Sequence, residues 1–357
     1  MSLLFSPFDW RKGLPSQRKL FSESFPENAG LPVETEAYYH RKFHSYPGET
    51  SSHEFVAEDG SGFVGYYAAL PFIYLVEGEP FRCGLVCDVM TSPRMQGKGV
   101  FTKLGAYSLE QITELGFDFV TGYPRRAAVI PGHLKVGWQI AFKLPMYLLP
   151  RKGDGILRAK GFAWMAGMIN PCLAAMQGLL GLKGSAAYSF EIWDWKAFLE
   201  AHDYSSFVSD WASTRKVTLK KTPEFLRWRL SIQEVDYRVV AVKKGNDLVG
   251  ISIVRACDPE GVPSLAVLDL MCIGEDRGIL RVMRRGWLRL AERWQREVVL
   301  MMMSEFHASK MGLWRLGFLR TPTIFSFILK RLSPKAQAQL PIGPEAWHLM
   351  WIDSDDL

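Results

Sequence analysis

The chain has 357 residues, of which 48% are hydrophobic and 22% are charged. This is the composition of a globular protein with a sizeable core, and the length exceeds one ordinary domain, so we expect two domains. The formal net charge of +6 is modest and the basic residues are scattered. The charge therefore favours anionic ligands only weakly and gives no support to nucleic-acid binding.

Cysteine and histidine spacing suggests neither a disulfide framework nor a metal site. The five cysteines form no CxxC pair, and their odd number points to a reducing compartment. The first residues lack the basic-then-apolar order of a signal peptide, so we expect a cytoplasmic protein. No histidine stands at ligand spacing with acidic partners, so we expect no metal.

The first 150 residues predict a mixed α/β domain. "HEFVAEDGSGFVGYYAAL" predicts two antiparallel strands around a Gly-containing turn, and the mostly apolar "LVCDVM" predicts a central strand. From Phe101 to Leu115, apolar residues recur at helical spacing, and Gly116 is a suitable helix terminator. "FDFVTGYP" then predicts a strand, and "HLKVGW" a short helix with a closing Gly-aromatic turn.

The next segment, "GFAWMAGMINPCLAAMQGLLGL" over residues 161–182, carries no charge and is long enough to span a bilayer. The Asn170-Pro171 pair, Gln177 and four glycines argue against a transmembrane helix. Interfacial contact with a membrane is a second interpretation. We favour a third, a helical hairpin bent at Pro171 and buried inside the protein.

The second half of the chain repeats the first. "EFLRWRLSIQEVDYRVVAVKKGNDLVGISIVRA" follows the order of helix end, strand, turn and strand seen before, and "AVLDLM" matches "LVCDVM". Asp269 thus corresponds to Asp88, and "LWRLGF" corresponds to "HLKVGW". We therefore expect two copies of one fold, over residues 1–150 and 191–357, joined by an uncharged helical linker over residues 151–190.

The loop "RMQGKG", residues 94–99, lies between the central strand and the helix. Free backbone N–H groups and the positive end of the helix dipole make this position an anion site. Gly97 and Gly99 lack the β-carbons that would keep a diphosphate from the backbone, and Arg94 and Lys98 add positive charge. The alternative interpretation is structural: the two glycines would serve only to form a tight turn before the helix.

The stretch "VCDVMTSPRMQGKGVFTKL" resembles the acyl-coenzyme A loop of the GNAT N-acetyltransferase superfamily, whose pattern is [RQ]-x-x-G-x-[GA] after a strand. Arg94, Gly97 and Gly99 carry the match. The resemblance implies two tandem GNAT-like domains, each a mixed, mostly antiparallel sheet flanked by helices, with acetyl-CoA as co-substrate. The closing "WHLMWIDSDDL" is similar to tandem proteins linked to cell-surface polysaccharide genes, which implies an amino sugar as one candidate acceptor.

The resemblance also implies the roles of individual residues. The diphosphate would be held by backbone amides of the loop, with help from the Thr102 hydroxyl. These amides are those of Gln96, Gly97, Lys98, Gly99 and Val100. The end of the central strand, Val89-Met90-Thr91, would pair its backbone with the pantetheine arm and polarise the thioester carbonyl.

Attack by an amine on a thioester needs a base for one proton and an acid for the departing thiolate. The family often places a Tyr four residues before the closing Gly, where this chain has His133; Tyr123 is the alternative acid. Asp88 is the candidate base, although its recurrence as Asp269 also fits a structural role.

The second copy reads "IGEDRGILRV" at the loop, with acidic residues where a diphosphate would lie, so we expect only the first copy to bind the acyl donor. The sequence thus predicts direct acyl transfer to a small-molecule amine. The alternatives are a non-catalytic acyl-CoA-binding module and a membrane-surface acyltransferase acting on a lipid-linked sugar.

Overall fold

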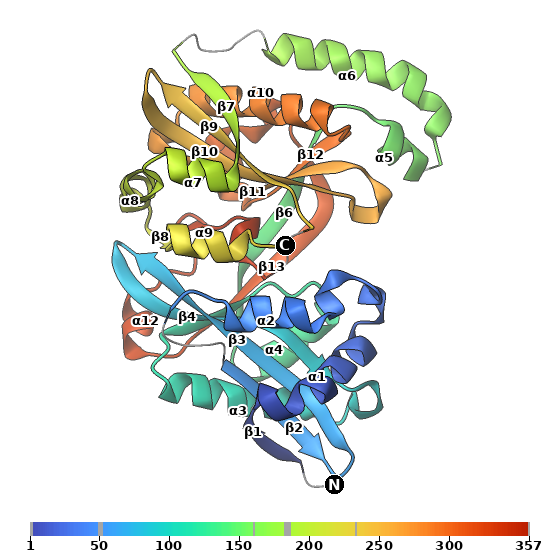
Figure 1. The fold of residues 1–357 in the computed structure, drawn as a ribbon, viewed down its shortest axis with the longest axis vertical. Coiled ribbons are helices and arrows are strands. Elements are labelled where there is room, and N and C mark those ends of the chain that lie inside the picture. The colour runs from blue at the N-terminus through green and yellow to red at the C-terminus, as the bar shows by residue number, and fades with distance from the viewer. Residues whose placement is uncertain (1–2, 49–52, 160, 182–186, 233, 356–357) are drawn as a thin grey trace. The chain divides into compact units, whose positions relative to one another are not determined.

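The computed structural model describes residues 3–48, 53–159, 161–181, 187–232 and 234–355 (Figure 1). The chain divides into two compact units. Unit 1 comprises Met1–Phe142 and Ser326–Ile342, and unit 2 comprises Lys143–Phe325 and Gly343–Leu357. We expected boundaries at residues 150 and 190. The structure differs in that a late segment, Ser326–Ile342, belongs to the first unit.

Unit 1 is built on a mixed sheet with the strand order β1-β2-β3-β4-β5-β13. β4 and β5 are parallel, and the other neighbours for which a register is known are antiparallel. The strands are β1 (Leu4–Pro7), β2 (His53–Asp59), β3 (Gly62–Val76), β4 (Glu79–Thr91), β5 (Phe119–Gly122) and β13 (Leu319–Arg331).

Helices cover both faces of this sheet (Figure 1). α3 and α4 pack on one face and α1 and α2 on the other; the bounds are α1 (Trp10–Ser24), α2 (Glu36–His44), α3 (Val100–Glu114), α4 (Ile130–Lys135) and, near the C-terminus, α12 (Pro334–Gln339). The predicted helix after the loop is confirmed as α3. Its apolar stripe, including Val100, Leu104 and Ile112, packs on Tyr67 and Val120 of the sheet, and Gly116 follows in the left-handed conformation.

Unit 2 has the strand order β7-β9-β10-β11-β12-β6, with β11 and β12 parallel. Its strands are β6 (Gln139–Pro150), β7 (Ser189–Asp194), β9 (Tyr237–Lys244), β10 (Asp247–Cys257), β11 (Ser264–Cys272) and β12 (Val298–Met302), with the short pair β8 (Val217–Leu219) and β14 (Trp347–His348). Its helices are α5 (Asp154–Ala159), α6 (Ala166–Gly181), α7 (Trp195–Ala201), α8 (Tyr204–Ser213), α9 (Pro223–Arg229), α10 (Arg277–Arg293) and α11 (Glu305–Met311).

The two units have the same order of strands. In each unit the strand beside the parallel pair comes from the other half of the sequence. β5 of unit 1 is joined on its outer side by residues 328–331 of β13, which come from the second half of the sequence. β12 of unit 2 is joined by residues 146–150 of β6, which come from the first half. Each parallel pair is thus flanked by an antiparallel strand that the other half of the sequence supplies.

The uncharged segment does not form the buried hairpin we expected. α6 runs through Pro171 as one helix, and Phe162, Trp164 and Met168 are exposed. In the described part of the chain, none of the helices combines the length and the apolar character that crossing a membrane requires. The expectation of burial was therefore wrong, because low charge alone does not decide which side of a helix faces the protein.

Candidate active site

The glycine loop connects β4 to α3 in unit 1. A short 3₁₀ helix, Pro93–Met95, follows the strand, and Gly97 and Gly99 then take left-handed conformations with φ of 76° and 79°. Side chains other than glycine rarely adopt such values, so the turn depends on both glycines. Gly99 is the N-cap of α3 and offers no side chain to its first amides.

The loop closes on itself through two long hydrogen bonds. The amide of Gln96 donates to Pro93 O over 3.4 Å and that of Lys98 to Met95 O over 3.3 Å. Among the residues that the structure describes, no backbone acceptor is recorded for the amides of Gly97, Gly99 and Val100. A β-carbon at Gly97 would meet no other atom within 4 Å. At this helix N-terminus the described residues therefore supply no backbone acceptor for three amides, and there is room for a further group beside Gly97.

Side chains around the loop hold its shape. Arg94 donates two hydrogen bonds to Asp59, of 2.9 and 3.1 Å, and one to the Ser61 hydroxyl. The Arg94 guanidinium holds the pKa of Asp59 well below its usual range. The Thr102 hydroxyl donates to Gly99 O over 3.0 Å. Arg94 thus ties the loop to the β2–β3 turn, and Lys98 is an exposed cation of the loop with no recorded ion pair among the described residues.

β4 and β5 part just before the loop. Their parallel pairing runs over three residues of each strand, from Cys83–Phe119 to Leu85–Thr121, whereas β4 stays paired with β3 as far as Thr91. One edge of β4 from Val86 onward therefore lies beyond its pairing with β5. Within this stretch a β-bulge interrupts the register with β3, and Asp88 takes a φ of 47°. Bulges of this kind redirect backbone groups out of the ladder.

The sheet face under α1 and α2 carries a buried polar cluster. Asp88 pairs with Lys42 of α2, with Nζ 2.8 Å from the carboxylate. Glu54 on β2 accepts hydrogen bonds from the hydroxyls of Tyr39, over 2.7 Å, and Tyr66. Sequence reasoning missed Glu54. The available signal was a carboxylate inside the strand pattern "HEFVA", and its tyrosine partners depend on a register that the sequence does not show.

His133 lies in an aromatic environment on α4. Its ring centroid is 5.0 Å from those of Phe101 and Trp138, both in edge-to-face geometry. Burial lowers the pKa of His133 to about 4, so the imidazole is neutral at pH 7. These surroundings suit a packing role better than proton transfer.

Tyr123 directly follows β5 and is buried. Its ring lies 5.3 Å from that of Phe327 on β13, within unit 1. The three candidates have different neighbours: the Phe327 ring for Tyr123, two aromatic rings for His133 and the Lys42 ammonium for Asp88. Of them, Tyr123 stands at the end of a strand that parts from β4.

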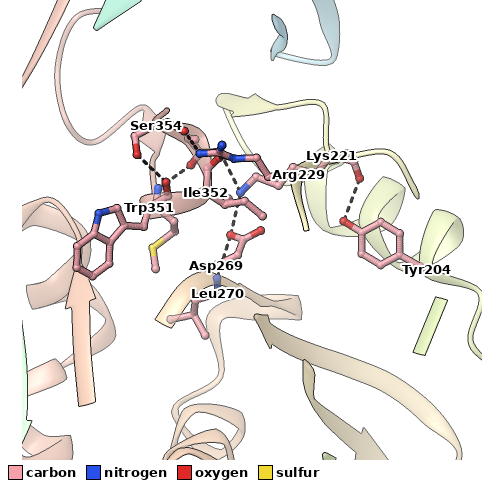
Figure 2. Close-up of polar contacts among 10 residues, drawn as sticks. Tyr204, Lys221, Arg229, Asp269, Leu270, Trp351, Ile352 and Ser354 are labelled. Atoms are coloured by element: carbon pink, nitrogen blue, oxygen red, sulfur yellow. Dashed lines mark hydrogen bonds and ion pairs between the residues drawn. The ribbon is translucent and has the colours of Figure 1, made fainter. Parts of the chain in front are cut away.

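Unit 2 keeps the aspartate but has a different loop. Asp269 on β11 pairs with Lys221 over 2.8 Å, and Lys221 also lies 3.2 Å from Asp353; all three side chains are fully buried (Figure 2). Burial is the main reason that the pKa of Asp353 is raised, to about 6. Both aspartates, Asp88 and Asp269, are thus ion-paired with a lysine, which supports a structural role for this position.

At the start of α10 the Asp276 carboxylate accepts a hydrogen bond from the Gly278 amide over 2.5 Å. The hydroxyl of Tyr188 donates to the same carboxylate. A protein carboxylate therefore occupies the place that, in unit 1, stays open at Gly99. That the second copy binds no diphosphate stays a prediction, for which a negative charge at this helix N-terminus is the physical reason.

Comparisons with known proteins agree with this geometry. Residues 12–141 match the family model described as an acetyltransferase (GNAT) domain. No curated protein matches the sequence. The structure resembles a GCN5-related N-acetyltransferase from Anabaena variabilis, at 13% identity and a TM-score of 0.65, covering 93% of this chain and 73% of that one.

Two further solved structures are similar. A probable N-acyltransferase from Enterococcus faecalis has a TM-score of 0.66 at 8% identity, over 93% of this chain and 73% of that one. A GCN5-related N-acetyltransferase from Kribbella flavida has a TM-score of 0.59 at 12% identity, over 95% and 73%. At these identities the likeness concerns the fold.

Proposed function

We propose, from the premise that residues 12–141 form a GNAT acetyltransferase domain, that the chain transfers an acyl group, most simply acetyl, from coenzyme A to a small-molecule amine. The observation that carries the proposal is the conjunction of two features in unit 1. The amides of the glycine loop are open, and the adjoining edge of β4 extends beyond its pairing with β5.

These two features match the two parts of the acyl donor. The amides of Gly97, Gly99 and Val100 would bind the diphosphate, with Lys98 adding positive charge. The pantetheine arm contains two amide groups and would extend along Val89-Met90-Thr91 in the manner of a further strand. The bulge at Asp88 would then direct a backbone N–H toward the thioester carbonyl, where negative charge develops.

The reaction is a direct transfer in a ternary complex. The amine nitrogen attacks the thioester carbon, the C–S bond breaks, the nitrogen loses one proton and the thiolate gains one. For the acid we propose Tyr123, which follows β5 where the two strands part, in preference to His133, which packs between the aromatic rings of Phe101 and Trp138. Asp88, which Lys42 holds, acts as a positioning residue that keeps the bulge in shape.

The free cysteines, all five of the sequence, support the proposal that the enzyme works in the reducing cytoplasm. An amino sugar is one acceptor class for a first screen.

The proposal is tested by calorimetric titration with acetyl-CoA, followed by thiol release with a panel of amines. We expect about one acetyl-CoA per chain and an amine-dependent release of coenzyme A. Tyr123→Phe should lower kcat by about 10² or more with little change in donor affinity, because a general acid acts on the leaving group only. Donor binding without turnover of any amine would favour the non-catalytic module, and a folded chain that binds no acetyl-CoA would refute both.

A further inference from the structure

The helix α6 of unit 2 turns its polar residues toward the protein and its apolar residues toward solvent, the reverse of an ordinary surface helix. A surface helix normally turns its apolar stripe to the core and its polar residues to solvent. α6 lies outside the layers formed by the sheet and α10 (Figure 1). Its amide side chains, Asn170 and Gln177, are seven residues apart and therefore share one face.

Both amides face the protein. Asn170 accepts a hydrogen bond from the Gly153 amide over 2.8 Å and donates to Asp154 over 2.9 Å. Gln177 donates to the Pro150 carbonyl over 2.7 Å and accepts from Arg284 on α10. These contacts fix the rotation of the helix about its axis. The apolar residues on the opposite side are therefore held outward.

The outward side is a continuous apolar ridge. Trp164 is 74% exposed and Met168 is 63% exposed. Pro171, Cys172 and Ala175 continue the exposed line at helical spacing, and Phe162 is exposed just before it. From Gly161 to Gly181 the sequence has no charged residue. Exposure of this ridge to water costs free energy in proportion to its apolar area. An exposed apolar patch of this kind indicates a surface that contacts a membrane or another molecule.

Basic residues lie on the segment that leads to the ridge. Lys152 and Arg158 are both exposed there. Between residues 151 and 183 the sequence has one acidic residue, Asp154, and its carboxylate accepts a hydrogen bond from Asn170. The neighbouring helix α10 carries six arginines and one glutamate in its sequence RGILRVMRRGWLRLAER.

We propose that the apolar ridge of α6 binds the surface of an anionic lipid bilayer. Met168 lies on the first turn of this uncharged helix, and the exposed Trp164 and Phe162 lie on the 3₁₀ turn just before it and on the residue preceding that turn. Exposed aromatic and apolar side chains next to basic residues are what a segment lying in the headgroup region presents. Each basic residue near the surface adds about 1 kcal/mol of attraction to anionic lipid. Lys152 and Arg158, exposed beside the ridge, are complementary in charge to an anionic lipid surface.

The test is co-sedimentation of the full chain with phosphatidylcholine vesicles and with vesicles in which about a third of the lipid is phosphatidylglycerol. We expect binding to the anionic vesicles that weakens with added salt. The double variant Trp164→Ser with Met168→Ser should bind at least about tenfold more weakly, because it removes two inserted side chains. The charge variant Lys152→Glu with Arg158→Glu should lose the preference for phosphatidylglycerol.

A matched control comes from the same unit. Trp314 and Leu319 are 68% and 61% exposed, so Trp314→Ser with Leu319→Ser removes similar apolar area from unit 2 without changing α6 or the residues before it. This control should bind like the wild type. A wild-type chain that stays in the supernatant, or an α6 variant that binds like the control, overturns the proposal. If the wild type does not bind vesicles but forms an oligomer, and the α6 variant is monomeric, the ridge would instead contact a second copy of the chain.

Discussion

The glycine loop makes a quantitative prediction for Gly97→Glu. At a φ of 76° any L-side chain costs about 1 kcal/mol of stability. The new carboxylate would lie beside the bound diphosphate. There it meets two negative phosphates at roughly 1 kcal/mol each even in water-like surroundings, and it displaces about one amide contact worth roughly 1 kcal/mol. The two phosphate terms and the lost amide contact together weaken acetyl-CoA binding by about 3 kcal/mol, or roughly 100-fold, whereas the backbone strain lowers stability only.

Gly78→Glu is the matched control. Gly78 has a φ of 88°, and a β-carbon added there, like one added at Gly97, would have no atom within 4 Å. It lies in the β3–β4 turn, at the far end of β4, about 40 Å along the strand from the loop. Calorimetric titration of both variants should show loss of binding for Gly97→Glu alone, at similar melting temperatures. Equal affinities in the two variants would refute the assignment of the loop as a diphosphate site.

Two further predictions concern stability. Lys42→Met and Lys221→Met each leave buried carboxylates without their cation and should lower the free energy of unfolding in urea by about 3 kcal/mol or more, with the larger loss for the fully buried Lys221; an unchanged midpoint would show that the pairs do not matter. His133 is neutral when folded, with a pKa of about 4, and its unfolded value is near 6.5, so the unfolded chain takes up the proton first and stability falls as pH drops between these values. His133→Phe should therefore lose about 2 kcal/mol less than the wild type between pH 7 and pH 5, and parallel pH profiles would contradict the burial of this ring.

The loop region could be predicted from sequence because its signals are local. The apolar run of β4, the two glycines and the stripe of α3 each lie within one element, and neighbouring residues determine them. The pairing of Lys42 with Asp88 spans 46 positions, and that of Glu54 with Tyr39 depends on how α2 lies on the sheet. Such contacts follow from tertiary packing, which one sequence does not show.

The exchanged strands and α6 illustrate two other limits. The alternation in β6 and β13 predicts a strand whichever neighbour it joins, so the choice of partner is not encoded within the strand. For α6, the lack of charge suggested burial. The seven-residue spacing of Asn170 and Gln177 did contain the clue that one side is polar, but not that this side faces the protein.

The exchange of edge strands has a consequence for how the protein is made. When the ribosome has synthesised unit 1 as far as Phe142, β5 still lacks the strand at Ser326–Arg331 that completes its sheet, roughly 180 residues later. At bacterial or eukaryotic elongation rates of about 5–20 residues per second, this leaves an unpaired β edge for roughly 10–40 s. An unpaired edge of this kind is a template for pairing with other chains, and the first unit can complete its sheet only after residues 328–331 have emerged.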